Sequence, residues 1–199
     1  MLNVHFSPFP LLSTSRLCLR QLDNTDLAAV LALYSNADVM RYIPRPLAQN
    51  PDDAQAIIDR INGRLINKEG INWAITHCQQ PNYTIGIIGY MRIMPEHYRA
   101  EVGYMLHPDY HRQGIMQEAL VTVLQYGFEV LHLHSVEAIL APENLASERL
   151  LQHNGFVKEA HFKEKEKFDG RYIDSMVYSL LQRNWQLSHP ATASAQASI

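Results

Sequence analysis

Residues 110–120 read YHRQGIMQEAL, and this stretch decides the fold of the chain. It follows a strand-like run from Ala100 to Leu106, and an apolar segment with helical spacing that ends near Leu131 comes after it. This order predicts a strand, a turn and a helix. Unpaired N–H groups in the first turn of a helix lie at the positive end of its dipole and favour phosphate. Because Gly114 lets a ligand approach the backbone and Arg112 adds a cation, we expect a pyrophosphate-bearing cofactor here.

Composition places the chain among ordinary globular proteins. It has 199 residues, 47% of them hydrophobic, which is enough for one good core. The formal net charge of −3 provides no overall field that would attract nucleic acid. The start of the chain lacks the pattern of a signal peptide, and no apolar run approaches the roughly 18 residues that span a bilayer. We therefore expect a cytoplasmic protein that binds neither nucleic acid nor membrane.

The cysteines and histidines give no sign of a metal site. The two cysteines, Cys18 and Cys78, fall in strand-like runs and have no metal-ligand spacing. We interpret both as small buried apolar side chains and expect neither a disulfide nor a metal. His132 and His134 flank one leucine, but no third ligand stands at a recognisable spacing.

The rest of the chain predicts an α/β (α+β) domain. Three strand-like runs, 71–78, 83–94 and 99–106, are joined by short polar turns, which predicts an antiparallel meander. The helix after Gly114 and a strand at 135–140 predict a parallel crossover.

Caps and turns fix the remaining boundaries. Asn50-Pro51 begins a helix, and Asp169-Gly170 joins the last two strands as a hairpin. We expect about seven strands and four helices in a mixed, mostly antiparallel sheet. A single domain would cover residues 1–185, followed by a disordered, Ala- and Ser-rich tail at 186–199.

Four motifs in a fixed order resemble the GNAT family, the GCN5-related N-acetyltransferases. They are Thr14 to Arg20, Glu101 to Tyr104, Gln113 to Leu120, and Asn144 to Ser147 followed by Gly155-Phe156. Within the family the chain looks like the branch that acetylates the N-termini of ribosomal proteins. The resemblance implies the GNAT fold and an acetyl-CoA-dependent N-acetyltransferase that needs no metal. It covers nearly all of the folded chain.

The resemblance also implies which residues bind acetyl-CoA. The pantetheine arm would run along the end of the strand before the turn, and main-chain N–H groups of the turn would hold the pyrophosphate. The expected residues are Met105, Leu106, His111, Arg112, Gln113, Gly114, Ile115, Met116, Asn144 and Ser147. The family usually has Gln or Arg where this chain has His111, so the main chain and Arg112 should carry most of the grip. Asn144 is also a good helix N-cap.

Two residues are catalytic candidates. Glu101 is the candidate general base, and the alternative is an exposed cross-strand partner for Arg92 or Arg99. Ser147 is the candidate acid that protonates the thiolate, and the alternative is a passive serine in the first helical turn. Tyr104 and Tyr172 are other possible proton donors.

The acceptor would be a primary amine that attacks acetyl-CoA directly in a ternary complex. The N-terminal amine of a protein or peptide, such as a ribosomal protein, is the first candidate. A small-molecule amine, or a non-catalytic acyl-CoA sensor on the same fold, is the alternative. The loop Met40 to Pro46 and the hairpin Phe168 to Tyr172 should form the acceptor side. We expect a monomer or a homodimer.

Overall fold

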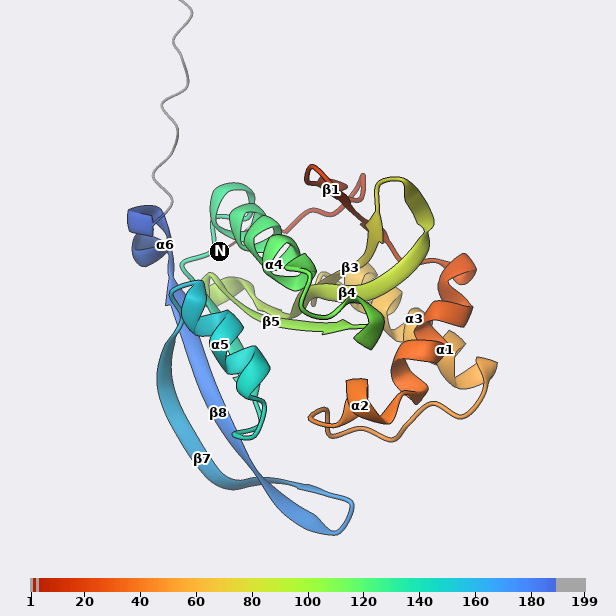
Figure 1. The fold of residues 1–199 in the computed structure, drawn as a ribbon. Helices are drawn as coiled ribbons and strands as arrows, with labels where there is room; N and C mark the ends of the chain where they lie inside the picture. Colours follow the sequence, from red (N-terminus) through yellow and green to blue (C-terminus); the bar gives the residue numbers. More distant parts are fainter. Residues whose placement is uncertain (1, 3, 189–199) are drawn as a thin grey trace, which may run out of the picture.

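The computed structural model describes residues 2 and 4–188, which form one eight-stranded sheet (Figure 1). The strand order is β1-β2-β3-β4-β5-β6-β8-β7. The strands are β1 Leu12–Ser13, β2 Leu17–Gln21, β3 Ile71–His77, β4 Gln80–Met94, β5 Arg99–Leu106, β6 Ser135–Leu140, β7 Val157–Phe168 and β8 Arg171–Leu181. Only β5 and β6 are parallel, so the expected mixed, mostly antiparallel sheet is confirmed. The short edge strand β1 accounts for the eighth strand.

The described residues form six α-helices, and four of them pack on the two faces of the sheet. The six helices are α1 Leu27–Ser35, α2 Ala37–Met40, α3 Pro51–Ile66, α4 Ile115–Gln125, α5 Leu145–His153 and α6 Gln182–Ser188. A π-helix, Tyr126–Val130, continues α4. The apolar faces of α1 and α3 pack together on one face of the sheet, and α4 and α5 contribute to the core on the other (Figure 1). Three short 3-10 helices, 24–26, 95–97 and 108–110, complete the helical segments.

The predicted caps and turns are present. The side chain of Asp23 accepts a hydrogen bond from the N–H of Thr25 at 2.7 Å, and the N–H of Asp23 donates to the Asp26 side chain at 3.0 Å, which forms a capping box ahead of α1. The Asn50 side chain accepts from the N–H of Asp53 at 3.0 Å and begins α3. Asp169 and Gly170 both have positive φ in the tight turn between β7 and β8. Local sequence therefore sets where these elements begin.

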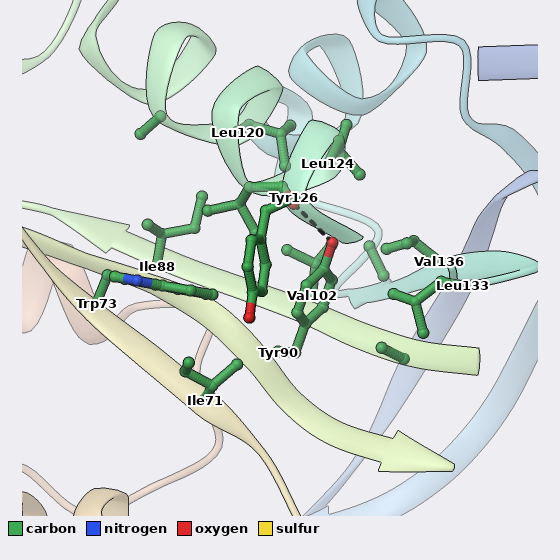
Figure 2. Packing of buried hydrophobic residues seen from close by; sticks show 14 of the residues in the cluster. Ile71, Trp73, Ile88, Tyr90, Val102, Leu120, Leu124, Tyr126, Leu133 and Val136 are labelled. Atoms are coloured by element: carbon green, nitrogen blue, oxygen red, sulfur yellow. Dashed lines mark hydrogen bonds between the residues drawn. The ribbon is translucent and has the colours of Figure 1, made fainter. Parts of the chain in front are cut away.

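A buried tyrosine fixes α4 on the sheet. Tyr90 is fully buried on β4, and its hydroxyl donates to the carbonyl of Val123 at 2.8 Å (Figure 2). A Cβ at Gly127 would overlap this hydroxyl, so only glycine allows the close approach. Trp73 and Tyr126 pack edge to face beside it, with ring centroids 5.5 Å apart. Since the body of α4 is held this firmly, the position of its N-terminus is fixed relative to β4 and β5.

Two expectations about the chain are wrong. Cys18 and Cys78 form a disulfide with a Cα–Cα distance of 5.1 Å, and Cys78 is exposed. The two cysteines are 60 residues apart in the sequence, but β2 and β3 are neighbours in the sheet, so that Cys78 lies beside Cys18 just past the end of β3.

The expected tail at 186–199 begins too early in the sequence, because α6 continues to Ser188. Residues 189–199 lie outside the described residues. None of the helices in the described part is long and apolar enough to cross a bilayer.

Candidate active site

The sheet splits between its two parallel strands. β5 and β6 pair only over Arg99–Glu101 and Ser135–Glu137, and β6 then pairs with β8 along its whole length. The second half of β5, from Val102 to Leu106, therefore has no strand partner on this side among the described residues. Figure 1 shows β5 diverging from the β7–β8 hairpin, with the start of α4 near the opening. An extended ligand could pair with this free strand edge.

The turn after β5 has the predicted geometry for an anion. Gly114 has φ +72° and precedes the first residue of α4, Ile115. The N–H groups of Ile115, Met116 and Gln117 have no hydrogen-bond partner within the described residues, because no earlier helical turn offers a carbonyl. Arg112, also at positive φ, is exposed beside them. Backbone donors and one cation thus converge at this helix start.

Two side chains of the turn are used to shape it. The Nε2 atom of His111 lies 3.1 Å from the carbonyl oxygen of Leu106, and the Gln113 side chain donates to the carbonyl of Asp109 at 2.9 Å. Both contacts fold the loop onto itself. The His111 side chain therefore contacts the protein's own backbone, which agrees with the expectation that main-chain N–H groups bind the pyrophosphate.

Arg16 also supports the turn, and sequence reasoning gave it no role. Its Nη2 donates to the carbonyl of Gln113 at 3.0 Å, and its guanidinium forms an ion pair with Glu118 on α4. The Thr14 hydroxyl also donates to Glu118. Thr14 and Arg16 belong to a motif that the sequence had marked, but the fold alone brings them to a turn almost 100 residues away.

Two adjoining cavities follow from this geometry. The first, which we call the turn cavity, lies between the turn, the end of β5 and the start of α5. Every residue expected to bind acetyl-CoA lines it except Gln113. The second, the inner cavity of about 190 Å³, reaches from β5 towards α1 and α3. The residues that line both are Tyr42, Ile43, Tyr104, Met105, Asn144 and Ser147.

Three residues with hydroxyl groups line this junction, Tyr42, Tyr104 and Ser147. Ser147 is in the first turn of α5, where its N–H donates to the Asn144 side chain at 3.2 Å, so the expected cap is present. The buried Tyr104 hydroxyl has no partner with hydrogen-bond geometry among the described residues. Burial raises the pKa of Tyr104 to about 12, and the nearby Ser147 side chain acts in the opposite direction. Tyr172, the other tyrosine considered, is 62% exposed on the hairpin and does not line the junction.

Glu101 lies beside the inner cavity and is not part of its wall. It points to the same face of β5 as Gly103, which does line the cavity. Arg92 is its cross-strand partner on β4, as the alternative interpretation expected. Burial, followed by repulsion from Glu137, raises the pKa of the Glu101 carboxyl, and Lys165, Arg92 and Arg64 oppose the shift. The raised pKa suits a proton acceptor, and a water would have to bridge to the cavity.

A third, open cavity extends the inner one to the surface. This hairpin groove, of about 1020 Å³, lies between the loop from Met40 to Leu47 and the hairpin tip from Phe168 to Asp174. It shares Tyr42, Ile43 and Arg45 with the inner cavity. The two segments expected on the acceptor side thus face each other. Within the described residues, no cluster of three or more His, Cys, Asp or Glu could hold a metal ion.

Comparisons with known proteins agree with this geometry. A family model described as an acetyltransferase (GNAT) domain matches residues 16–157. An uncharacterized N-acetyltransferase of Bacillus subtilis, YoaA, is 34% identical over 174 residues, covering 87% of this chain and 98% of the relative. The spermidine N-acetyltransferase of Vibrio cholerae, solved with CoA and spermine, is 26% identical with a TM-score of 0.75, covering 86% of this chain and 99% of that one.

A third comparison bears on the fold alone. RimL, a ribosomal alpha-N-protein acetyltransferase solved with coenzyme A, superimposes with a TM-score of 0.78 at 20% identity, covering 86% of this chain and 98% of that one. The expected resemblance is thus confirmed in fold and in sequence. This chain belongs to the GNAT family of N-acetyltransferases.

Proposed function

We propose that the protein transfers the acetyl group of acetyl-CoA to the N-terminal amine of a protein or peptide in a ternary complex. The observation that carries this proposal is the continuity of the three cavities. The inner cavity meets the turn cavity at Tyr104 and Ser147, and it meets the hairpin groove at Arg45. Donor and acceptor can therefore reach one point from opposite sides. Neither cysteine lines a cavity, so direct attack needs no acetylated cysteine.

The donor side binds acetyl-CoA chiefly through backbone. In the proposal, the N–H groups from Arg112 to Met116 hold the pyrophosphate, with charge-assisted hydrogen bonds worth about 1.5–3 kcal/mol each. The free edge of β5 at Met105 and Leu106 pairs with the pantetheine arm. An N–H group there polarises the thioester carbonyl and stabilises the oxyanion. Gly114 allows the turn because its φ of +72° would strain a residue with a side chain, and a Cβ there would contact the Arg16 guanidinium that supports the turn.

The chemical step uses Glu101 and Ser147. Glu101 accepts the proton of the attacking ammonium through a water, and its raised pKa brings it closer to neutral pH than an ordinary carboxylate. Ser147 donates a proton to the departing thiolate, and the buried hydroxyl of Tyr104 beside it can take over or relay that proton. Asn144 keeps Ser147 in place through the cap of α5.

The hairpin groove supports a peptide acceptor. It is larger than the inner cavity and adjoins it, so a chain in the groove could place its first residue in the inner cavity. A polyamine is the second candidate, because spermidine N-acetyltransferases are among the relatives. The groove also contains Glu143 and Asp169, which could attract a cation, although Arg41 and Arg45 line it as well.

An assay of CoA release tests the proposal. Acetyl-CoA would be offered with a panel of N-terminal peptides and with spermidine, and the released thiol measured. We expect release with at least one peptide and mass spectrometry to place the acetyl group on the α-amine. Tight CoA binding without release for any amine would instead indicate a sensor, and release with spermidine alone would indicate a polyamine enzyme.

We also propose that the reaction takes place in the cytoplasm. Cytosolic thiols are kept reduced, so Cys18 and Cys78 should be free thiols in protein alkylated at the moment of cell lysis. They should form the disulfide only after oxidation. A disulfide already complete at lysis would contradict this location.

A further inference from the structure

Three arginines converge on one tyrosine in the inner cavity. Arg60 and Arg64 lie one turn apart on α3, and Arg45 comes from the loop before it. All three line the inner cavity together with the buried Tyr34 of α1. Each of them lowers the pKa of the Tyr34 hydroxyl, although burial has the larger effect and raises it. The three positive charges are therefore close to one point of the cavity.

No acidic side chain of the cavity compensates these charges. The wall of the inner cavity has no Asp or Glu among the described residues. None of the three guanidinium groups forms an ion pair with another described residue. Arg64 donates one hydrogen bond, to the carbonyl of Met91 at 3.3 Å. Burial, together with repulsion from Arg45 and Arg64, lowers the pKa of Arg60. Like charges four residues apart on a helix are destabilising, so this arrangement favours an added anion.

A buried amide gives a second, independent indication of a ligand. Asn72, only 3% exposed on β3, lines the same cavity. Its Oδ1 atom has no partner among the described residues, and its Nδ2 donates only to the sulfur of Met91, a weak acceptor, at 3.1 Å. A buried amide without full hydrogen bonding is costly, and a polar ligand in the cavity would relieve that cost.

We propose that the acceptor carries a carboxylate a few bonds from its reactive amine and that Arg45, Arg60 and Arg64 bind it. Guanidinium groups match carboxylates with paired hydrogen bonds, and they repel a polyamine at the same place. The inner cavity of about 190 Å³ is smaller than the roughly 300–1000 Å³ usual for whole ligands, so it can hold only the end of an acceptor. The inference rests on the proposed function and defines its substrate class.

The hairpin groove has mixed charge, because Arg41 and Arg45 line it together with acidic residues. Its acidic residues are Glu143, Asp169 and Asp174, of which Asp174 already contacts His161 at 2.8 Å and Lys163 at 3.1 Å. The charged side chains that line the inner cavity are therefore all positive, whereas a carboxylate in the groove would meet charges of both signs. The same chemistry could come from a peptide with Asp or Glu as its first or second residue, or from a free acidic amino acid.

Matched acceptors test the inference. Peptides that begin with Asp or Glu would be compared with otherwise identical peptides that begin with Asn or Gln, with free aspartate and with spermidine. We expect kcat/KM to favour the acidic member of each peptide pair by about tenfold or more. The variants R60Q and R64Q should each remove this preference, so that the acidic and the neutral member of a pair react with equal kcat/KM, and the exposed R149Q on α5 should keep it. Faster turnover of free aspartate than of any peptide would identify the small acid as the source.

A binding measurement separates this inference from the proposed function. Calorimetry would follow N-acetylaspartate, a product analogue, binding to the CoA-loaded protein. We expect binding in the wild type and in R149Q, and a loss of about tenfold or more in R60Q and R64Q. Equal rates for acidic and neutral peptides, or binding that the arginine variants do not change, would overturn the carboxylate site. Failure of every amine to release CoA would overturn only the proposed function, because the calorimetry still tests the arginines.

Discussion

The turn cavity and the inner cavity are built from different parts of the chain. In the proposed binding mode, the turn cavity holds acetyl-CoA mostly through main-chain N–H groups of one short stretch, from Arg112 to Met116. Side chains from α1, α3, α5, the four strands β3 to β6 and the loop from Met40 to Leu47 line the inner cavity. A site made of main-chain N–H groups tolerates changes of side chain but not changes of backbone conformation. In a cavity lined by side chains, replacing one residue leaves the surrounding backbone in place but changes which ligands bind.

The strongest test of this contrast replaces the glycine of the turn. G114V should weaken CoA binding about 1000-fold, because a branched side chain at φ +72° strains the turn and displaces two or more charge-assisted hydrogen bonds. Calorimetry with CoA would measure the loss. G170V is the matched control, since Gly170 has φ +75° at the hairpin tip, far along the chain from the turn. An equal loss of affinity in both variants would mean that general strain, and not the turn, is responsible.

The second test concerns Glu101. E101Q should lower kcat/KM about 100-fold at neutral pH, as expected for removal of a general base, with CoA affinity unchanged. The wild-type rate should rise with pH through a pKa above the usual 4.5, and the rate of the variant should not rise in this pH range. An unchanged rate across the pH range would remove Glu101 from the chemistry.

Stability gives an independent measure of the same residue. Because the pKa of Glu101 is raised in the folded protein, the folded state binds its proton more tightly than the unfolded state. Ionised Glu101 therefore costs stability, and the cost is present at neutral pH and disappears as the pH falls below about 4.5. E101Q should be more stable than the wild type at pH 7, and the difference in urea unfolding should vanish in acid. A less stable E101Q would show that its pairing with Arg92 outweighs burial.

Features that depend on neighbouring residues can be predicted from this sequence, whereas features that depend on contacts between distant segments cannot. The helix start at Asn50, the turn at Gly114 and the hairpin at Asp169-Gly170 are local signals, and each was predicted correctly. The arginine group was not predicted, because Arg45, Arg60 and Arg64 meet Tyr34 only after α1 and α3 pack together. The contact of Arg16 with the turn and the disulfide of Cys18 with Cys78 also depend on distant pairing. Periodicity cannot show which distant segments meet.

A smaller effect is expected at the junction of the two cavities. S147A should lower kcat about tenfold, because the nearby Tyr104 hydroxyl can still protonate the thiolate. In the double variant S147A/Y104F, kcat should fall by considerably more than the product of the two single-variant decreases. Stopped-flow measurement of thiol release would compare all three variants. Loss of CoA binding in S147A with normal chemistry would assign Ser147 to the cap of α5 instead.

The smallest effect concerns the support of the turn. R16A should weaken CoA binding about threefold to tenfold, because it removes one hydrogen bond to Gln113 and a half-exposed ion pair with Glu118. R183Q on α6, where Arg183 is exposed, is a control for the loss of one positive charge. A loss as large as that of G114V would show that Arg16 contacts the cofactor itself.

The central claim is that donor and acceptor meet where the turn cavity joins the inner cavity. A crystal structure with CoA linked through its sulfur to the N-terminus of an acidic peptide tests it most directly. The account predicts the pyrophosphate on the N–H groups from Arg112 to Met116, the linked sulfur beside Ser147 and Tyr104, and the peptide carboxylate against Arg60 and Arg64. A pyrophosphate bound away from Gly114, or a peptide that enters without occupying the inner cavity, would contradict it.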